Sequence, residues 1–349
     1  NGEATLRPLW PGVDAAANLE RHVSFLRSEG FLNLFFELDL GIPWHAKPDS
    51  LMRKMKTTRL VIFDCDNTMG VPGKPIDDGQ ALLYLFGRQD VELLGITTCF
   101  GNGTVDEAFG ATQALLCELG REDVPLFKGA GQRGQTATPA ARFLAESVAA
   151  APGEVTLLAI GPLSNLWAAA RLDPIFFHKV KHISIMGGYL QALAGPYWEN
   201  VPERNLASDS QASHAVLNAP CPVTLMTAQI CLDAPFGLDE LARLESWSGT
   251  RLHRAMRDWV LQCEMTSGRA GDYLWDLLPA VYISYPEMFE HELVQVLSTV
   301  ADLASGRLVL RPAGAGPAVN VPSHIRDVEA FYGILYDAWS RVHLGECVE

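Results

Sequence analysis

The chain has 349 residues and a hydrophobic content of 48%, so it can bury a sizeable core as one large α/β domain or two ordinary ones. Its formal net charge of −14 argues against a nucleic acid or an anionic membrane surface as partner and favours a small neutral or cationic ligand. The 7 cysteines are scattered singly, which favours reduced thiols in a cytoplasmic protein, and no apolar run reaches the ~18 residues of a membrane helix.

Residues 1–55 differ in character from the rest of the chain, with scattered tryptophans and prolines and one predicted helix over 15–29. No motif in this segment indicates chemistry. We therefore predict an N-terminal extension over residues 1–55 and a single domain over residues 56–349.

Four carboxylates lie between the first two strongly apolar runs. Val61–Phe63 is typical of a buried parallel strand, because short runs of β-branched and aromatic residues fit a sheet covered on both faces. Two of the acids, Asp64 and Asp66, follow this strand, and the other two, Asp77 and Asp78, begin a predicted helix. The glycines and prolines between them prevent regular structure, so all four acids should gather at the carboxyl edge of the sheet.

Four acids at close range must share a cation or stay partly protonated. Oxygen ligands without a His or Cys cluster suit a hard divalent ion, Ca²⁺ or Mg²⁺, better than zinc. An alternative is that Asp77 and Asp78 simply cap the helix N-terminus. That alternative leaves Asp64 and Asp66 without a role.

From residue 60 onward the pattern alternates strand and helix, as in a parallel sheet built from βα units. Asn102 follows the second strand and should share an edge with the acids. The glycine-rich stretch 129–134 lacks the Lys of a phosphate-binding loop and is predicted to be a mobile rim. The strands are predicted to begin at residue 60 and to lie at 91–98, 125–128, 155–160, 181–186 and 222–227, with helices at 105–119 and from Ser164 and Asp209. We expect an open, mostly parallel, Rossmann-like sheet with helices on both faces.

The later part of the chain begins with a polar, aromatic stretch at 189–204, which we predict to be a loop that touches the ligand. A helix over 273–282 should carry Trp275 and Asp276 in its first turn. The remaining predictions are helices at 238–245, 251–266 and 327–342, and short strands at 293–300 and 306–310.

Short motifs recur at the strand ends in a fixed order. None is specific alone, but their order and spacing together are. They are Asp64-Cys65-Asp66 followed after an insertion by Ile76-Asp77-Asp78, Ile96-Thr97-Thr98 with Gly101-Asn102, Gly161 to Asn165, Met186-Gly187-Gly188, Glu203 and Asn205 with Asp209, and Trp275-Asp276.

Over residues 59–342 this set resembles the inosine-uridine type nucleoside hydrolases, calcium enzymes that cleave the N-glycosidic bond of ribonucleosides. The resemblance implies the nucleoside hydrolase fold, a small-molecule ribonucleoside as substrate and a homo-oligomer, either a dimer or a tetramer. It also implies a Ca²⁺ site formed by Asp66, Asp78, Asp276 and the carbonyl oxygen of Ile160.

The resemblance implies further roles around this ion. Asp66 would also be the general base, and Asp64 would support its loop from behind. The ribose hydroxyls would be held by Asp77, Asn102, Glu203 and Asn205, with Met186 beneath the sugar. Acidic side chains around the sugar would stabilise the positive charge that develops as the glycosidic bond breaks.

Two features depart from the family pattern. Residues 67–75 form an insertion between the paired acids. Trp275 stands where better-known members carry a His that acts as leaving-group acid. Members that prefer purine nucleosides can carry Trp there and activate the base by stacking on it, so the resemblance favours a purine preference. An alternative is that Trp275 is packed in the core. Arg269, on a predicted loop, is a further candidate for assisting the leaving base.

Two other functions fit parts of the sequence. The segment Val61–Thr68 is close to the opening of haloacid-dehalogenase-like phosphatases, in which Asp64 would be the nucleophile and the metal Mg²⁺. That assignment needs a Lys after a later strand, whereas Lys179 and Lys181 precede one. A non-catalytic nucleoside or sugar-binding protein is the other alternative, because the usual His is missing.

Overall fold

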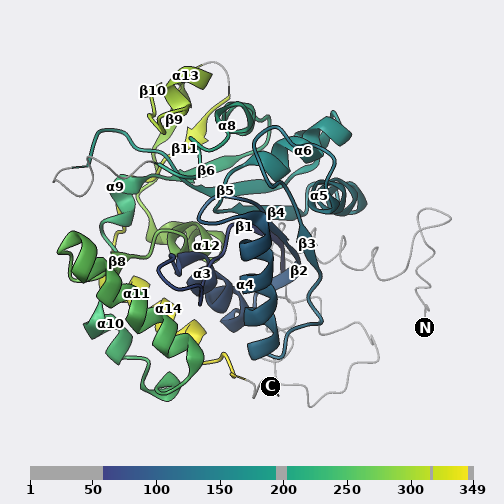
Figure 1. Cartoon of the computed structure of the whole chain (residues 1–349). Coiled ribbons are helices and arrows are strands. Elements are labelled where there is room, and N and C mark those ends of the chain that lie inside the picture. Colours follow the sequence, from purple (N-terminus) through teal and green to yellow (C-terminus); the bar gives the residue numbers. More distant parts are fainter. Residues whose placement is uncertain (1–57, 194–202, 315–316, 345–349) are drawn as a thin grey trace, which may run out of the picture. The chain divides into compact units, whose positions relative to one another are not determined.

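The computed structural model describes residues 58–193, 203–314 and 317–344. Within these ranges nine strands form one sheet in the order β10-β9-β11-β6-β5-β4-β1-β2-β3, and two short strands, β7 and β8, pair separately (Figure 1). The strands are β1 Arg59–Cys65, β2 Val91–Thr98, β3 Leu126–Lys128, β4 Val155–Ala159, β5 His182–Met186, β6 Val223–Met226, β7 Pro235–Phe236, β8 Asp272–Tyr273, β9 Leu293–Val296, β10 Leu310–Pro312 and β11 Val319–Asn320.

The sheet is parallel from β3 to β11 and antiparallel at its β9 and β10 end. The strands predicted to begin near residues 60, 91, 155, 181 and 222 all lie in it, which confirms the expected open, mostly parallel sheet. The division into an extension over 1–55 and a domain over 56–349 remains a prediction, because residues 1–57 lie outside the described residues, as does the helix predicted at 15–29.

Helices cover both faces of the sheet (Figure 1). Side chains alternate along β1, so Val61 and Phe63 join the core formed with α3, α12 and α14, and Ile62 joins the core formed with α5, α6 and α8. The helices are α3 Asp77–Gly87, α4 Val105–Glu118, α5 Pro139–Ala150, α6 Ser164–Leu172, α7 Phe176–Lys179, α8 Ser210–Leu217, α9 Ala228–Cys231, α10 Leu238–Ala242, α11 Arg251–Ser267, α12 Leu277–Ser284, α13 Val300–Leu303 and α14 Val328–Trp339, with 3₁₀ turns at Glu245–Trp247 and Pro286–Met288.

Local sequence signals account for several helix ends. A capping box between Thr104 and Glu107 opens α4, and the Thr250 side chain accepts the His253 N–H at the start of α11. Gly268 ends α11 in the left-handed conformation at φ 67°, which glycine adopts without steric cost. These signals fix the residues at which α4 and α11 begin and the residue at which α11 ends.

Two predictions in the second half of the chain are wrong, and some elements of the fold were not predicted. Trp275 and Asp276 precede α12 instead of occupying its first turn, because Asp272–Tyr273 pairs with Pro235–Phe236 as a strand. The strand predicted at 306–310 begins only at Leu310, and α5 and β11 were not predicted. Long-range strand pairing decided these segments, and it leaves no periodic signal in short stretches.

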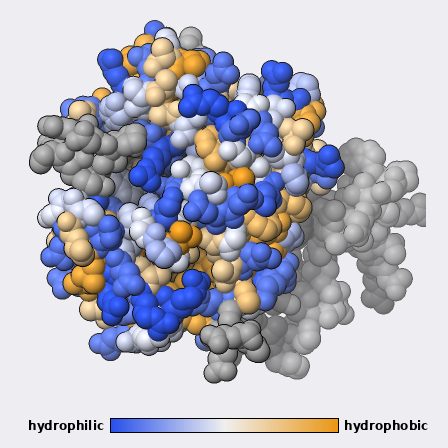
Figure 2. All heavy atoms as spheres, viewed as in Figure 1, coloured by the Kyte–Doolittle hydropathy of each residue, from blue (hydrophilic) through white to orange (hydrophobic). Residues whose placement is uncertain are grey.

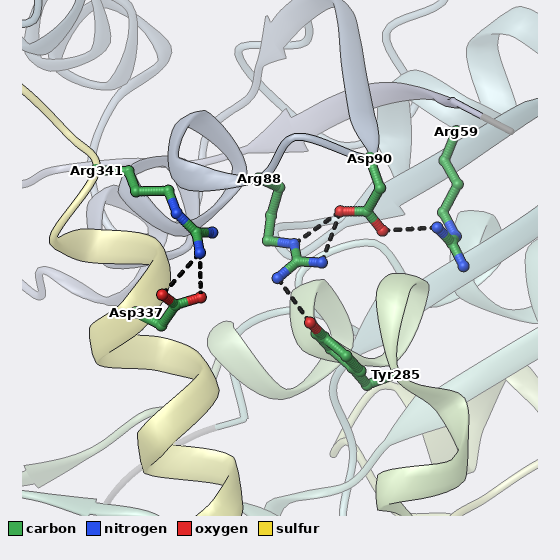
Figure 3. A network of polar contacts seen from close by, with 6 residues as sticks. All are labelled: Arg59, Arg88, Asp90, Tyr285, Asp337 and Arg341. Atoms are coloured by element: carbon green, nitrogen blue, oxygen red, sulfur yellow. Dashed lines mark hydrogen bonds and ion pairs between the residues drawn. The ribbon is translucent and has the colours of Figure 1, made fainter. Parts of the chain in front are cut away.

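The amino end of the sheet is tied by a buried charge network (Figure 3). Asp90, 3% exposed, accepts hydrogen bonds from Arg59 at 2.6 Å and from Arg88 Nε at 2.8 Å. Arg88 also donates to the Tyr285 hydroxyl at 2.9 Å. The network therefore joins the start of β1, the end of α3 and the residue after α12, at the opposite end of the strands from the acids.

The surface mixes residue types. Figure 2 shows hydrophilic and hydrophobic residues interspersed over the face viewed in Figure 1. Large exposed apolar side chains such as Met265, 82% exposed, and Leu293, 61% exposed, come from different elements and are ordinary as isolated cases. Among the described helices, none has the length and apolar character needed to span a membrane.

Candidate active site

The predicted acids lie at the carboxyl edge of the sheet, where the chain order changes direction. Strand β1 pairs with β2 on one side and with β4 on the other, so a crevice opens beyond their ends. Asp64 and Asp66 lie at the end of β1, and Ile160 follows β4 and donates its N–H to the Asp64 carbonyl oxygen at 2.9 Å. The topology thus places the two motifs side by side.

Three carboxylates form the centre of the site. One oxygen from each of Asp77, Asp78 and Asp276 lies within 4.8 Å of the others. Asp66 adjoins them, because its backbone N–H donates to Asp78 Oδ1 at 3.0 Å. Asp66 and Asp78 are fully buried and Asp276 is 2% exposed, so the acids are withdrawn from bulk water.

Several carboxylate oxygens of the cluster lack hydrogen-bond partners among the described residues. Asp66 Oδ1, Asp77 Oδ1 and Asp276 Oδ1 are buried and have no hydrogen-bond partner among the described residues. Burial and the neighbouring acids raise the pKa of Asp66 and of Asp77 to about 7, and they raise the pKa of Asp78 and of Asp276 well above the usual range. A cluster of orphaned carboxylate oxygens is a donor set that a hard divalent cation fits.

Two glycines allow the backbone to approach Asp66. A Cβ at Gly101, where φ is 156°, would lie 2.0 Å from Asp66 Oδ2, and one at Gly161 would lie 2.8 Å from Asp66 Oδ1. The same turn lets the Asn102 N–H donate to Asp66 Oδ2 at 2.5 Å, while Asn102 Nδ2 donates to Asp78 Oδ2 at 3.3 Å. Asn102 therefore lies beside the acids, as its place after β2 predicted.

Asp64 lies behind the cluster. Its Oδ1 accepts hydrogen bonds from Thr97 Oγ1 at 2.5 Å and from Asn165 Nδ2 at 2.7 Å. Burial raises the pKa of Asp64 to about 7, although these two hydrogen bonds lower it. Asn165 Oδ1 in turn accepts the Ala130 N–H at 2.8 Å, and Ala130 is fully buried, so the stretch predicted to be a mobile rim is anchored at this point.

A second polar group closes the other side of the site. Asn205 Nδ2 donates to the carbonyl oxygens of Ile160 at 2.8 Å and Met186 at 3.1 Å, and to Met186 Sδ at 3.3 Å. The Glu203 carboxylate accepts the backbone N–H groups of Gly188, Asn205, Leu206 and Ala207. Glu203 thereby holds the turn that presents Asn205.

Two tryptophans form an aromatic side of the site. Trp275 and Trp259 are half-buried, and each packs against the core below while lining the cavity. Asp272 accepts a hydrogen bond from each indole, at 3.0 Å for Trp275 and 2.8 Å for Trp259. Trp259 and Asp272 were not singled out from the sequence. Trp259 lies within a helix pattern, where an aromatic residue gives no functional signal.

The cavity has a volume of about 540 Å³, within the range of small-molecule sites. Asp64, Asp66 and Asp78 do not line it and lie behind its wall. The loop predicted at 189–204 to touch the ligand lines the cavity with Tyr189, Ala192, Leu193, Glu203 and Arg204. Its residues 194–202 lie outside the described residues. The predicted site residues among its lining are Asp77, Asn102, Ile160, Met186, Glu203, Asn205, Trp275 and Asp276.

Comparison with known proteins identifies the family. The model of the inosine-uridine preferring nucleoside hydrolases matches residues 61–333. The chain belongs to this family. Uridine nucleosidase 1 of Arabidopsis thaliana is 30% identical over 267 residues, which cover 66% of this chain and 76% of that protein. The pyrimidine-specific ribonucleoside hydrolase RihB of Escherichia coli is 25% identical over 310 residues, which cover 79% of this chain and 96% of the relative.

Solved structures of nucleoside hydrolases share the fold. The plant nucleoside hydrolase PpNRh1 superposes with a TM-score of 0.70 at 22% identity, covering 80% of this chain and 98% of that one. The purine-preferring ribonucleoside hydrolase of Gardnerella vaginalis gives 0.70 at 20% identity, covering 81% and 99%. The fold is therefore the nucleoside hydrolase fold.

Family membership gives the reaction class. The protein is a hydrolase that acts on the N-glycosyl bond of ribonucleosides, and the carboxylate cluster agrees with the metal dependence of the family. The phosphatase alternative is set aside. Lys179 pairs with Asp173 at 2.6 Å and Lys181 with Glu154 at 3.9 Å, and both pairs lie before β5, away from the carboxyl edge.

Proposed function

We propose that this nucleoside hydrolase holds a Ca²⁺ ion between three carboxylates and one backbone carbonyl. The proposed ligands are Asp66, Asp78, Asp276 and the carbonyl oxygen of Ile160. The observation that supports this set is the group of buried carboxylate oxygens without partners, two of which belong to Asp66 and Asp276. The Ile160 carbonyl accepts the Asn205 amide and keeps a second lone pair for a cation. When bound, the ion supplies positive charge that lowers the pKa of a neighbouring water.

Calcium suits this site better than magnesium. Ca²⁺ accepts six to eight oxygen ligands in a flexible geometry, including backbone carbonyls, whereas Mg²⁺ demands a small octahedral set and keeps several waters. The proposed set combines carboxylates from β1, α3 and the segment before α12 with a carbonyl after β4. A ligand set of protein oxygens drawn from several chain segments is typical of calcium sites.

Asp66 is the proposed general base. Its Oδ2 is engaged by the Asn102 N–H, whereas its Oδ1 has no partner among the described residues. We therefore assign proton transfer from the attacking water to Oδ1. A neighbouring cation favours the ionised form of Asp66, which is the form that accepts a proton. Asp64 and Asn165 support the end of β1 from behind.

The ribose is proposed to lie between Asn205, Asp77 and Asn102. These side chains face the cavity with amide and carboxylate groups that match sugar hydroxyls. Glu203 fixes the Asn205 turn, and Met186 forms an apolar floor beneath the sugar. As the glycosidic bond breaks, the surrounding acids stabilise the positive charge on the sugar.

The base is proposed to lie against Trp275, with purines preferred. The support is the aromatic side of the cavity, because stacking on an indole favours a large base and is worth about 1–3 kcal/mol per base in single-strand binders. The names of the relatives differ in this respect, since those of the plant and Escherichia coli proteins specify uridine or pyrimidines and that of the Gardnerella protein specifies purines.

The test is release of ribose from inosine, adenosine, guanosine, uridine and cytidine, with and without a chelator. We expect turnover of purine nucleosides that chelation abolishes and Ca²⁺ restores. Turnover that survives complete chelation would contradict the metal proposal, and faster uridine hydrolysis would contradict the purine preference. Nucleoside binding without any ribose release would favour the non-catalytic alternative.

We also infer a cytoplasmic homo-oligomer. Five buried cysteines among the described residues, Cys65, Cys99, Cys221, Cys231 and Cys263, are free thiols, which supports a reducing compartment. The expectation of a dimer or tetramer rests on the family resemblance. Light scattering on the purified chain tests it, and a monomer at micromolar concentration would refute it.

A further inference from the structure

Asp272 lies at a junction of three hydrogen bonds on the aromatic side of the cavity. Its Oδ2 accepts the Trp259 indole N–H at 2.8 Å, and its Oδ1 accepts the Trp275 indole N–H at 3.0 Å and Arg269 Nη1 at 3.2 Å. The Asp272 side chain is 11% exposed and that of Arg269 is 16% exposed. Asp272 and its three partners all line the cavity. One shielded carboxylate therefore holds both of the tryptophans that face the cavity.

The backbone fixes this carboxylate between separate elements. Trp259 comes from α11, Asp272 from β8 and Trp275 from the segment before α12. Asp272 is opposite Phe236 in the β7–β8 pair, and a Cβ at the preceding Gly271 would lie 2.3 Å from the Phe236 carbonyl oxygen. The close backbone contact at Gly271 leaves Asp272 little freedom to move away from the two indoles.

A carboxylate has two effects on an indole that donates to it. The charge-assisted hydrogen bond orients the ring, and the negative charge at the N–H edge makes the ring face more attractive to a cation. A purine base becomes positively charged when solvent protonates a ring nitrogen before the C–N bond breaks, and the electron pair of that bond then neutralises the base as it leaves. Faces polarised in this way therefore bind the protonated base, which is ready to leave, more strongly than the neutral base of the substrate.

We propose that Asp272 is a positioning and specificity-determining residue, which orients and polarises Trp259 and Trp275 as faces for a purine base that is protonated before it leaves. The inference rests on the proposed function and deepens it. It assigns to Asp272, a residue that touches no reacting atom, part of the work that a leaving-group acid does in other members. A purely structural role, in which Asp272 only satisfies two indole N–H groups, makes different predictions.

The test compares two kinds of leaving group in Asp272→Asn. The carboxamide keeps the shape and one acceptor oxygen but loses the charge and the second acceptor. We expect kcat/KM for inosine and adenosine to fall about tenfold or more, mainly in kcat, and kcat/KM for a p-nitrophenyl riboside to stay within about twofold, because that leaving group needs no protonation. Asp258→Asn is the matched control, since Asp258 is on α11, is exposed and pairs with Arg257.

A double-mutant cycle identifies the residues through which Asp272 acts. Phenylalanine keeps an aromatic face but has no N–H, so Asp272→Asn in a Trp259→Phe/Trp275→Phe background should change purine turnover by less than about twofold. An undiminished tenfold effect in that background would overturn the proposal. Equal losses on the nucleosides and the p-nitrophenyl riboside in the single variant would also overturn it and would indicate general disruption of the pocket.

A binding measurement separates this inference from the proposed reaction. If the wild-type chain releases no ribose from any nucleoside, the proposed function fails, but calorimetry with adenine still tests the aromatic faces. We then expect Asp272→Asn to weaken adenine binding by about threefold or more relative to Asp258→Asn, because the two indoles lose the hydrogen bonds that orient them. Equal affinity in the two variants, or no adenine binding to the wild type, would overturn the inference.

Discussion

At the scale of single residues, the site depends on close approach to Asp66. Backbone from two different loops packs directly against its carboxylate, at Gly101 and Gly161. Asp78 then accepts the Asp66 N–H, so one acid orients the next. Small changes at these residues should therefore act on catalysis with little effect on folding.

Removing Asp78 tests the metal site without deleting the proposed base. Asp78→Ala should weaken Ca²⁺ affinity and lower turnover by about 100-fold or more, because no other carboxylate replaces its oxygen in the cluster. Calcium titration by calorimetry and ribose release measure the two effects. Asp123→Ala, at an exposed ion pair with Arg121, is the control for charge. Normal metal affinity together with normal turnover in Asp78→Ala would rule out this ligand assignment.

A methyl group at Gly101 should reach Asp66 directly. Its Cβ would lie 2.0 Å from Asp66 Oδ2 at a φ of 156°, so Gly101→Ala must displace the carboxylate or the Asn102 turn. We expect turnover to fall at least about tenfold. Gly110→Ala is the matched control, because nothing lies within 4 Å of that Cβ in α4 and alanine favours the helix. Comparable activities of the two variants would contradict this account.

We expect Trp275 to affect turnover only for leaving groups that require activation before they depart. Trp275→Ala is expected to cut turnover of purine nucleosides far more than that of a p-nitrophenyl riboside, by about 10-fold or more in the ratio. Steady-state kinetics on both substrates provide the comparison. Equal losses would mean that Trp275 only packs the pocket, and the purine preference would then lose its physical basis.

At the scale of elements, the two ends of the parallel strands have different tasks. The orphaned acids lie at the carboxyl edge of the sheet, at the end of β1, the start of α3 and the segment before α12. The amino end is tied by Asp90, whose charge is fully compensated (Figure 3). Charge that is uncompensated favours a cation, and charge that is compensated stabilises the fold. Changes at the two ends should therefore separate activity from stability.

Asp90→Asn should destabilise the protein by about 2–4 kcal/mol at pH 7, since it leaves Arg88, whose side chain is 6% exposed, without its partner. Burial alone would raise the pKa of Asp90, but the charge and hydrogen bonds of Arg88 lower it below the usual value. The carboxylate's contribution is thus present above the unfolded-state pKa of an aspartate and is lost as pH falls through the lower folded pKa.

Chemical denaturation of the wild type and Asp90→Asn at several pH values checks this prediction. The stability difference should be constant near neutral pH and shrink in the acid range. Asp337→Asn, at the exposed pair with Arg341 shown in Figure 3, should change stability by less than about 1 kcal/mol. A difference between wild type and Asp90→Asn that grows on acidification would contradict the assigned sign.

At the scale of the whole molecule, the acidic cluster couples the sheet to α3 and to the segment before α12. Repulsion within the cluster opposes folding when the ion is absent, and an ion that binds only the folded chain stabilises it by mass action. Added Ca²⁺ should therefore raise the melting temperature by several degrees, as about 2.7 kcal/mol is gained at a concentration 100 times Kd. Calorimetry with and without chelator measures the shift, and Asp78→Ala should abolish it. An equal shift in that variant would place the ion elsewhere.

The sequence by itself determined the β1 strand, the acids at its end and the order of the later motifs. These features are local, because a buried strand needs a run of apolar residues and a parallel sheet brings successive strand ends to one edge. The six strands from β1 to β6 and the place of Asn102 beside the acids could be predicted on that basis. The places of Asn205 and Trp275 at the cavity were predicted from the family resemblance, which the order of the motifs carries.

The tertiary structure alone decided which partners these residues meet. Asn165 reaches Asp64 across 101 residues of sequence, and Asp272 joins Trp259 to Trp275 only because β8 pairs with β7. Because of the same strand pairing, α12 begins only after Asp276. Contacts of this kind depend on strand register and on the packing of distant segments, which short-range periodicity does not encode.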